Sequence, residues 1–496
     1  MNLTNKYKSP PPFLKVNRMH RIILLCSILL IGQVSLAQQM GANYNENLDQ
    51  IDPGLINQSG TKWVRAFVNV LTLVNINNAG TITGVNTNAV NNTKIGPFLD
   101  CRQHNANLIL SLKFDFKNLL GNRVPLHNTP EFTHIKNAIV QLLKRNAGGR
   151  KLGKNLAILT VGNEPMYETP SFGVPNYTSF TDKMINQMAL LRGNNNWSYE
   201  IFTGAVNDFS NKTNDGIANA TIDIAKTNNN VDGMDIHIHV SAYNQISADL
   251  TALRNKGMNK KLICTEFSLH RLVRSKMGTN LGNWGANNGY SSGMKIWQFI
   301  NDCMVRRENN NPISPNKWKS FWNSRGWYQN NWFDQFYNAF ESKNVWVATY
   351  GMVRPMRPGF RLTANSPAWV VNAAFNDQIL GSGPGGNPIA NPFSHPRWKY
   401  YVDNPSSRLA AENANEEVTE PRVFIYPNPT RDYLNVRMDT PESGNISLLT
   451  IDGRTVMVKD QVIGHHKLYI GDLPKGIYLL RIKRAGKSYN ERIMIN

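Results

Sequence analysis

The sequence predicts two modules, an α/β fold of the (β/α)8 TIM-barrel class and a small all-β sandwich that follows it. Three observations support this division. Eight short apolar runs alternate with helical stretches up to residue 404, which is typical of a (β/α)8 barrel. A Gly/Pro/Asn-rich and then acidic stretch over residues 383–421 indicates a linker. From residue 422 onward, apolar and polar residues alternate between Gly-containing turns, which predicts β-strands.

The N-terminus carries a targeting pattern. Arg21 precedes an apolar run over residues 22–31, and Ser35-Leu36-Ala37 forms a small-x-small cleavage site. The run is shorter than the roughly 20 residues that cross a bilayer, so we expect no transmembrane segment in the mature chain. The expected division is a signal peptide over 1–37, a catalytic barrel over 38–382, a linker over 383–421 and a sandwich over 422–496.

The net charge bears on possible partners, and the cysteine spacing bears on disulfide content. The formal charge is +20, and removing the five Lys and Arg residues of the signal peptide leaves +15. This excess favours an acidic polysaccharide or an anionic cell surface, or is only a solvated basic surface. No Lys/Arg cluster resembles a nucleic-acid-binding stripe, so no nucleic-acid partner is expected. Cys101, Cys264 and Cys303 have no regular spacing, which excludes a disulfide framework and predicts buried thiols.

The barrel prediction depends on eight apolar runs. They cover residues 41–44, 63–68, 108–114, 156–161, 200–206, 234–240, 261–266 and 345–350. Between them, residues 129–143 predict a helix with Thr129 as its cap and Pro130 at its first position. A second helix is expected from Ser247 to a stop at Gly257. A doubly wound sheet is the competing fold, but no Gly-rich phosphate loop follows any of these runs.

Two glutamates stand at the ends of expected strands. Glu164 follows the fourth, in LAILTVGNEP, and Glu266 ends the seventh, in KLICTE. Barrel enzymes place catalytic residues at the C-terminal ends of strands, and strands four and seven face each other across the barrel mouth. Two carboxyl groups about 5–5.5 Å apart can act there as acid/base and nucleophile on one glycosidic bond. The alternative is that each glutamate forms an ordinary surface salt bridge.

The residues beside the glutamates fit this chemistry. Asn163 is placed to hold a sugar hydroxyl next to the reacting carbon. Pro165 fixes the backbone after Glu164 and ends the strand. Arg65, late in the second strand, is expected to keep Glu266 ionised and aimed.

Four motifs together resemble the clan A glycoside hydrolases, which have a (β/α)8 fold and a retaining mechanism. They are GNEP at 162–165, TEF at 265–267, VRAF at 64–67 and VDGMDIHIH at 231–239. The resemblance implies that Glu164 is the acid/base with Asn163 as its partner, and that Glu266 is the nucleophile. It places Arg65 and His237 in the site as well.

The sequence departs from this pattern in two places. His239 stands where many members have Tyr, and Tyr350 ends the eighth strand where Trp often lies under the sugar. We expect His237, His239, Tyr243 and Tyr350 to contact substrate, together with Trp284 as a stacking platform on a Gly/Asn-rich loop.

His237 and His239 also raise a metal alternative, because residues i and i+2 of a strand point to one side and can share an ion. No further His stands at a later strand end, and His270 lies beyond in a loop, so we expect no metal and no cofactor. A helical spacing of Trp and Phe over residues 318–340 predicts core packing for those aromatic residues.

The tail resembles the C-terminal sorting domain of the type IX secretion system of Bacteroidetes. The resemblance rests on YPNPTRDYLNV, the central DGR and LPKGIYLLRI, within residues 422–496. It implies export across both membranes to the cell surface or the medium, with the secretion machinery as partner; a carbohydrate-binding sandwich is the alternative. The whole chain is therefore expected to be an exported retaining glycoside hydrolase acting on a polysaccharide or oligosaccharide. The alternatives are a non-catalytic surface glycan-binding protein and a metal-dependent barrel hydrolase.

Overall fold

The computed structural model describes residues 38–46, 48–405, 423–426, 428–438, 444–462, 465–484 and 487–496. The expected signal peptide, residues 1–37, lies outside the described residues. The chain forms two compact units, which divide between residues 409 and 410. Each unit is treated separately below.

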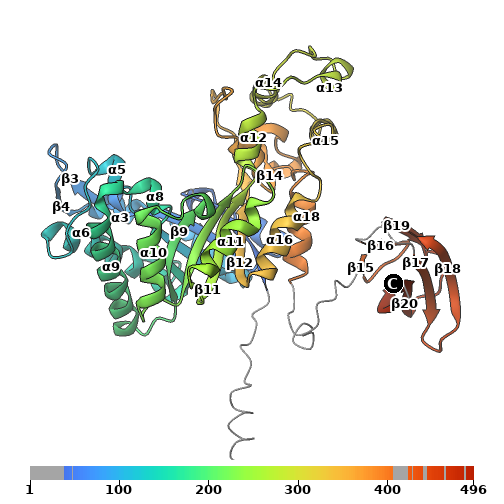
Figure 1. The fold of residues 1–496 in the computed structure, drawn as a ribbon, viewed down its shortest axis with the longest axis horizontal. Helices are drawn as coiled ribbons and strands as arrows, with labels where there is room; N and C mark the ends of the chain where they lie inside the picture. The colour runs from blue at the N-terminus through green and yellow to red at the C-terminus, as the bar shows by residue number, and fades with distance from the viewer. Residues whose placement is uncertain are drawn as a thin grey trace, which may run out of the picture. The chain divides into compact units, whose positions relative to one another are not determined.

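The first unit is a closed barrel of eight parallel strands, in the order β1-β12-β11-β10-β9-β8-β5-β2 (Figure 1). All eight expected strands are present, with ends that shift by a few residues. They are β1 (Gln39–Asn43), β2 (Trp63–Asn69), β5 (Asn107–Lys113), β8 (Leu156–Val161), β9 (Glu200–Asn207), β10 (Gly233–His239), β11 (Lys261–Ser268) and β12 (Val345–Gly351). The predicted (β/α)8 fold is confirmed.

Helices cover the outside of the barrel between successive strands. They include α2 (Pro53–Ser59), α4 (Gly96–Asp100), α6 (Pro130–Lys144), α9 (Val174–Asn194), α10 (Gly216–Thr227), α11 (Gln245–Asn255), α16 (Trp332–Ser342) and α18 (His395–Asp403). Both predicted helices are present, although α11 begins two residues earlier than expected. On α6, the buried residues Phe132, Ile135, Ile139 and Leu142 follow the predicted apolar face.

The inside of the barrel has an apolar floor and a polar layer above it. The floor is a small cluster of fully or nearly fully buried side chains: Trp63, Ile109, Ile158, Phe202, Ile263 and Val347. One step further along the strands, the interior side chains are buried and polar: Arg65, Ser111, Thr265 and Asp235. Hydrogen bonds join these groups in pairs, which offsets the cost of burying them.

Two irregularities in strand pairing redirect side chains toward the mouth. Between β10 and β11 the register shifts, so that Asp235 pairs with Ile263 but His237 pairs with Glu266. The extra residue on β11 lets Thr265 and Glu266 both face inward, whereas strict alternation would turn Glu266 outward. A second shift lies between β9 and β10, just before Asn207. Both irregularities therefore supply residues of the site described below.

A helical insertion separates β11 from β12. It contains α12 (His270–Lys276), α13 (Asn283–Asn287), α14 (Ile296–Glu308) and α15 (Pro315–Asn323), and Figure 1 shows these helices projecting from the barrel. The insertion has an aromatic core of Trp284, Phe299, Trp318 and Phe321. The predicted core role of the aromatic residues over 318–340 is confirmed, since Trp318, Trp322, Trp332 and their neighbours on α16 are buried.

The segment after β12 differs from the prediction. Residues 383–421 were expected to be a linker, but α18 (His395–Asp403) packs against the barrel. Trp398 is fully buried and donates from Nε1 to the Gly41 oxygen of β1 over 2.9 Å. Because this contact joins the segment to the first strand, residues up to 403 belong to the barrel unit. Residues 406–421 of the expected linker lie outside the described residues.

The second unit is the predicted β-sandwich. Its strands are β15 (Val423–Tyr426), β16 (Tyr433–Met438), β17 (Gly444–Thr450), β18 (Thr455–Val462), β19 (His465–Tyr469), β20 (Gly476–Arg484) and β21 (Lys487–Ile495). They form one sheet in the order β15-β16-β19 and another in the order β18-β17-β20-β21. A core of its own fills the space between the sheets, including Leu434, Val436, Leu448, Leu480 and Ile493. The predicted Asp452-Gly453 turn joins β17 to β18.

Two further predictions concern the described residues. Cys101, Cys264 and Cys303 are free and buried, as expected. In the part of the chain that the structure describes, no helix combines the length and apolarity needed to cross a membrane.

Candidate active site

Glu164 follows β8 on a turn with an unusual backbone. Gly162 has φ +111°, and a Cβ there would meet the Gly204 oxygen at 2.9 Å. Glu164 has φ 38° and ψ 51°, in the left-handed region that non-glycine residues rarely adopt. Pro165 is the first residue of α8 (Pro165–Glu168), a position that needs no N–H donor. This turn ends the strand and places the Glu164 carboxylate in the barrel mouth.

The carboxylate of Glu266 lies against a fully buried arginine. Arg65 Nη1 donates to Glu266 Oε1 over 2.7 Å, and Arg65 Nη2 donates to Asn163 Oδ1 over 2.6 Å. Nε2 of His237 and Nε2 of His239 each lie 3.7 Å from one oxygen of Glu266. Burial alone would raise the pKa of Glu266, but the charges of His237 and Arg65 outweigh it and hold the pKa well below its usual value. Glu266 is therefore ionised at neutral pH.

Glu164 has amide and imidazole partners. Its Oε1 accepts from Asn207 Nδ2 over 2.5 Å and lies 3.1 Å from His237 Nδ1. Burial would raise the pKa of Glu164, but the hydrogen bond and the charge of His237 lower it, while the charge of Glu266 opposes that lowering. The ring of His237 thus contacts both carboxylates, one through each nitrogen, so that Glu164 and Glu266 share one imidazole.

A buried chain of hydrogen bonds holds His237 from behind. Thr265 Oγ1 donates to Asp235 Oδ2 over 2.6 Å and lies 3.1 Å from His237 Nε2. The Thr265 amide also donates to Asp235, over 3.0 Å. Burial would lower the pKa of His237, but the carboxylates of Glu266 and Glu164 raise it above its usual value. Because both ring nitrogens have partners, Glu164 at Nδ1 and Thr265 at Nε2, the ring orientation is fixed.

Asn163 links the buried arginine to a third carboxyl group. Its Nδ2 donates to Glu168 Oε1 over 3.0 Å while its Oδ1 accepts from Arg65. Lys113 Nζ lies 3.8 Å from the same Glu168 oxygen. Burial raises the pKa of Glu168 to about 8, so this group is protonated at neutral pH and carries no charge there.

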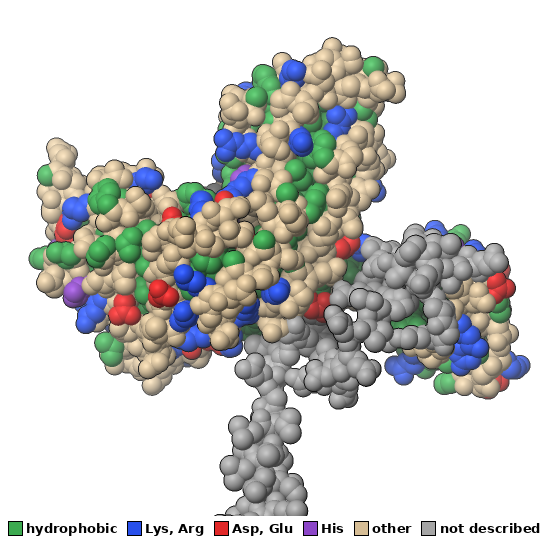
Figure 2. All heavy atoms as spheres, in the orientation of Figure 1, with side chains coloured by type: hydrophobic (Ala, Val, Ile, Leu, Met, Phe, Trp, Pro, Cys, Tyr) green, Lys and Arg blue, Asp and Glu red, His purple; other side chains and the backbone are tan. Residues whose placement is uncertain are grey.

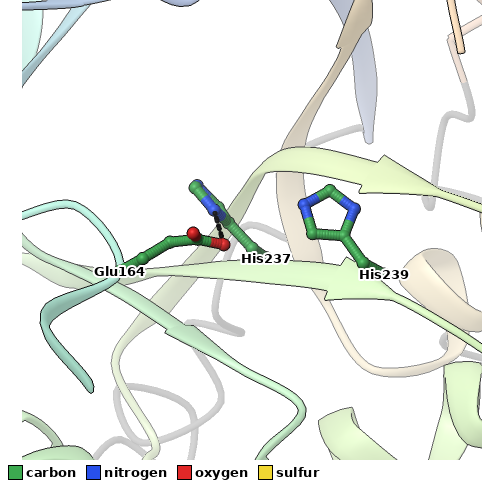
Figure 3. Close-up of side chains that lie close together, drawn as sticks. All are labelled: Glu164, His237 and His239. Atoms are coloured by element: carbon green, nitrogen blue, oxygen red, sulfur yellow. Dashed lines mark hydrogen bonds and ion pairs between the residues drawn. The ribbon is translucent and has the colours of Figure 1, made fainter. Parts of the chain in front are cut away.

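Three ligand-type groups lie close enough to hold a metal ion. One atom each from Glu164, His237 and His239 lies within 4.8 Å of the others. Figure 3 shows Glu164 reaching toward His237, with His239 one step further along the same strand. His239 Nδ1 lies 2.8 Å from Ser268 Oγ, and its Nε2, 3.7 Å from Glu266 Oε2, has no partner within hydrogen-bond distance among the described residues.

The two carboxylates open into a cavity of about 540 Å3 at the barrel mouth. Its described lining includes Asn163, Glu164 and Glu266, together with Phe67, Lys113 and Glu168. Residues after β12 supply another wall, with Arg354, Arg357, Phe360 and Trp369. A volume of this size is typical of small-molecule and sugar-subsite clefts, which range over about 300–1,000 Å3.

The structure separates the residues expected to touch substrate into two groups. Asn163 lines the cavity, whereas Arg65, His237 and His239 are buried behind the carboxylates and contact them instead. Arg65 was also expected to keep Glu266 ionised and aimed, and its Nη1 does contact that carboxylate. For His237 and His239, which were expected to contact substrate, the observed contacts include Glu164 and Glu266.

Three expected aromatic contacts lie elsewhere. Tyr350 points outward from β12 and packs on Phe267 and Phe333 between barrel and helices. Trp284 lies in the core of the insertion, where Nε1 donates to Ser320 Oγ over 2.9 Å. The Tyr243 hydroxyl donates to the Trp327 oxygen and accepts from the Gln329 amide. The described lining of the cavity includes none of these three side chains.

Trp369 occupies the place that was expected of Tyr350. It lies in the loop after β12, lines the cavity, and stacks on His270 with ring centroids 3.8 Å apart. Burial lowers the pKa of His270 to about 2, so the stacked ring is neutral. Sequence reasoning missed Trp369 because it lies nearly twenty residues beyond the strand end, in a loop without periodicity. It also missed Asn207 and Glu168, although Glu168 lies only four residues after Glu164.

Comparison with known proteins identifies the second unit. Residues 424–496 match the family model described as the secretion system C-terminal sorting domain. This segment is a sorting domain. It indicates export through the type IX secretion system, to the cell surface or the medium, and the secretion machinery as a partner. A comparison of the sequence with curated proteins gives no match.

The barrel is similar in fold to solved glycoside hydrolases at low identity. One is a hyperthermostable endo-1,4-β-D-mannanase from Thermotoga petrophila, at 11% identity, TM-score 0.44 and coverage of 74% of this chain and 99% of that one. Another is an endo-β1,6-glucanase, at 12% identity, TM-score 0.42 and coverage of 88% and 92%. A third is a modular endo-β-1,4-mannanase from Cellulomonas fimi, at 11% identity, TM-score 0.36 and coverage of 92% of this chain and 94% of that one. At these values the comparisons carry no argument about activity.

Proposed function

We propose that the barrel is a retaining glycoside hydrolase that cleaves O-glycosidic bonds of a polysaccharide or oligosaccharide. The observation that carries the proposal is the pair of carboxylates, Glu164 and Glu266, which share one cavity and one imidazole. Their surroundings differ in the way that the two roles require. Glu266 has a permanent cation, Arg65, at 2.7 Å, whereas Glu164 has a titratable partner, His237, at 3.1 Å.

The proposed first step forms a bond between a Glu266 oxygen and the anomeric carbon, while the bond to the leaving oxygen breaks. Glu164 gives its proton to that leaving oxygen. In the free protein His237 lowers the pKa of Glu164, so in this proposal Glu164 takes up its proton from His237, whose Nδ1 lies 3.1 Å from Glu164 Oε1, before it acts as the acid. The electron pair of the broken bond leaves with the departing oxygen, which the proton neutralises.

The second step reverses the first with water in place of the leaving group. Once Glu266 is esterified it has no charge, and its contribution to raising the pKa of Glu164 disappears. Glu164 then becomes the stronger acid and stays ionised, as a base that takes a proton from water must. Asn163, held by Arg65 and Glu168, is placed in the cavity to hold a sugar hydroxyl.

We also propose that residues 1–37 are a signal peptide, and that the sorting domain and barrel act independently. The separate apolar cores of the two units support this reading.

The proposed activity is tested by incubating the purified full chain with a panel of plant, algal and bacterial polysaccharides and measuring the products by mass spectrometry. We expect shorter oligosaccharides from at least one polysaccharide, and none with the Glu266→Ala variant. Binding without any product, equal in wild type and variant, would favour a non-catalytic glycan-binding protein.

The close grouping of Glu164, His237 and His239 favours a second candidate, a metal-dependent hydrolase. In that case the ion would replace the His237–Glu164 hydrogen bond and activate water. Treatment with EDTA at neutral pH separates the two candidates. We expect activity to survive the chelator; loss that zinc restores would establish the metal-dependent alternative.

A further inference from the structure

Two arginines line the same cavity as the candidate catalytic glutamates. Arg354 lies on β13 (Val353–Arg354), which pairs with β14 (Phe375–Asn376) beyond the end of β12, and Arg357 follows in the next loop. The backbone pairing fixes the position of Arg354. Its Nε donates to Gln378 Oε1 over 3.1 Å, and Gln378 is itself anchored on the Met304 sulfur.

The carboxylates that line this cavity already have partners within the protein. Three of them have a cation or imidazole within 3.1 Å: Glu46 with Lys113, Glu164 with His237, and Glu266 with Arg65. The fourth, Glu168, is protonated near neutral pH because burial raises its pKa. The acidic side of the cavity therefore leaves nothing to neutralise the arginines.

Arg354 and Arg357 have no acidic partner among the residues that the structure describes. The hydrogen-bond partner of Arg354, the Gln378 amide, is neutral. Burial, together with the nearby charge of Arg357, lowers the pKa of Arg354 to about 10, which leaves its guanidinium charged at neutral pH. Arg354 is partly buried and Arg357 is exposed, and their like charges repel each other unless an anion joins them.

The surface next to this wall is also basic. Trp369 separates the cavity from a second hollow, lined by His270, Arg271 and Arg274 of α12. Arg271 pairs with Asp208, whereas Arg274 is exposed. Figure 2 shows Lys and Arg side chains gathered around α12, beside the hollow that separates the projecting helices from the rest of the barrel.

We propose that Arg354 and Arg357 bind an anionic substituent, a carboxylate or a sulfate ester, on the glycan that enters the cavity. The inference rests on the proposed function, because it assigns the substrate class of the same site. Guanidinium groups bind both kinds of anion through paired N–H donors. Because this wall and the two glutamates line one cavity, the anionic group would lie on the sugar at the bond to be cleaved or on a neighbouring sugar.

The test measures binding with the full-length Glu266→Gln variant, so that turnover does not consume the ligand. Probes are polygalacturonate and alginate as polyuronides, a sulfated galactan, and mannan and a β-glucan as neutral glycans, each titrated by calorimetry at low and at high salt. We expect binding of one anionic class, weakened by salt. The two anionic arms distinguish a carboxylate from a sulfate.

Arginine variants in the same background show whether the proposed wall is responsible. A charge-assisted hydrogen bond typically strengthens binding about 10- to 100-fold, so Arg354→Gln and Arg357→Gln should each weaken anionic binding by about that factor. Arg361→Gln removes one charge from the same loop outside the cavity and should leave binding unchanged. Because Arg357 is exposed, its variant does not depend on core packing.

Three results would overturn the inference. They are tighter binding of a neutral glycan than of every anionic one, binding of no anionic probe, and anionic binding that neither arginine variant weakens. Hydrolysis of a neutral glycan by wild type would leave the proposed activity intact while this inference fails. Conversely, arginine-dependent binding of an anionic glycan without hydrolysis would support the inference and contradict the proposed activity.

Discussion

Replacing Arg65 by Met tests the most heavily connected residue of the site. Arg65 is fully buried and donates to Glu266, Asn163, Ser111 and Asn43 at 2.6–3.2 Å. Met keeps the apolar stem of the side chain but has no guanidinium, so it leaves the buried Glu266 carboxylate with only the histidines as partners. Breaking a buried ion pair from one side costs about 3–5 kcal/mol. We therefore expect the barrel to lose stability by about that amount at pH 7.

Tryptophan fluorescence during thermal unfolding measures this loss in the full chain. All 11 Trp residues precede residue 405, so the signal reports on the barrel and not on the sorting domain. A loss of about 3–5 kcal/mol corresponds to a drop in Tm on the order of 5 °C or more for a domain of this size. Arg306→Met, which removes a surface ion pair with Asp302, is the matched control and should cost less than about 1 kcal/mol.

The stabilising effect of the Arg65–Glu266 ion pair should depend on pH. The pKa of Glu266 is lowered in the folded protein, so its pairing stabilises the fold above the usual Glu pKa and loses that effect as the pH falls through the lowered value. The difference in Tm between wild type and Arg65→Met should therefore shrink below about pH 4. A loss at pH 7 no larger than that of Arg306→Met would refute the reasoning.

Three other predictions address separate parts of the account. The pKa of Glu168 is raised to about 8 in the folded protein, so its protonated form stabilises the fold fully below the usual Glu pKa, and this contribution is lost as the pH rises through 8. Glu168→Gln should remove this loss from a profile of Tm against pH. A profile that the variant leaves unchanged would contradict the prediction. Deleting residues 422–496 should leave Tm and activity of the barrel unchanged after cytoplasmic expression, because the sandwich has its own core; aggregation of the truncated chain would show that the units depend on each other. Glu164→Ala should slow hydrolysis of natural linkages at least about 100-fold, yet spare aryl glycosides whose leaving groups need no proton, and equal losses on both would contradict the acid/base role.

The barrel itself could be predicted from the sequence because its strands are fully buried. Runs such as LAILTV and LILSLK are continuous and apolar, and the helical stretch at 129–143 has a clear period. The same reasoning did not predict helix α18. Its sequence, HPRWKYYVD, follows a Gly/Pro-rich stretch and has little apolar periodicity, and its place in the barrel depends on Trp398 reaching β1, far away in sequence.

The candidate site shows a similar contrast. Glu164 and Glu266 could be found from strand ends and neighbouring residues, but alternation alone would have turned Glu266 outward. The irregular pairing of β10 with β11 turns Glu266 inward, but the strand sequence KLICTEFS contains no pattern that predicts this irregularity. Asn207 depends on the corresponding irregularity in β9.

Residues supplied by loops were the least predictable. Trp284 was expected over the cleft because its loop is rich in Gly and Asn, but the insertion buries it in a separate aromatic core. Trp369 and Arg354 reach the cavity through pairing and stacking between distant segments, which no local pattern indicates.

Chemical rescue of Glu266→Ala tests the central claim most directly. The variant, with an aryl glycoside of the sugar that the polysaccharide panel identifies, should be at least about 1,000-fold slower than wild type. Added azide should restore turnover by occupying the space of the missing carboxylate, and NMR should show a glycosyl azide of inverted anomeric configuration, because only one displacement then occurs. Full activity of Glu266→Ala without azide, or a rescued product of retained configuration, would contradict the assignment of Glu266 as the nucleophile.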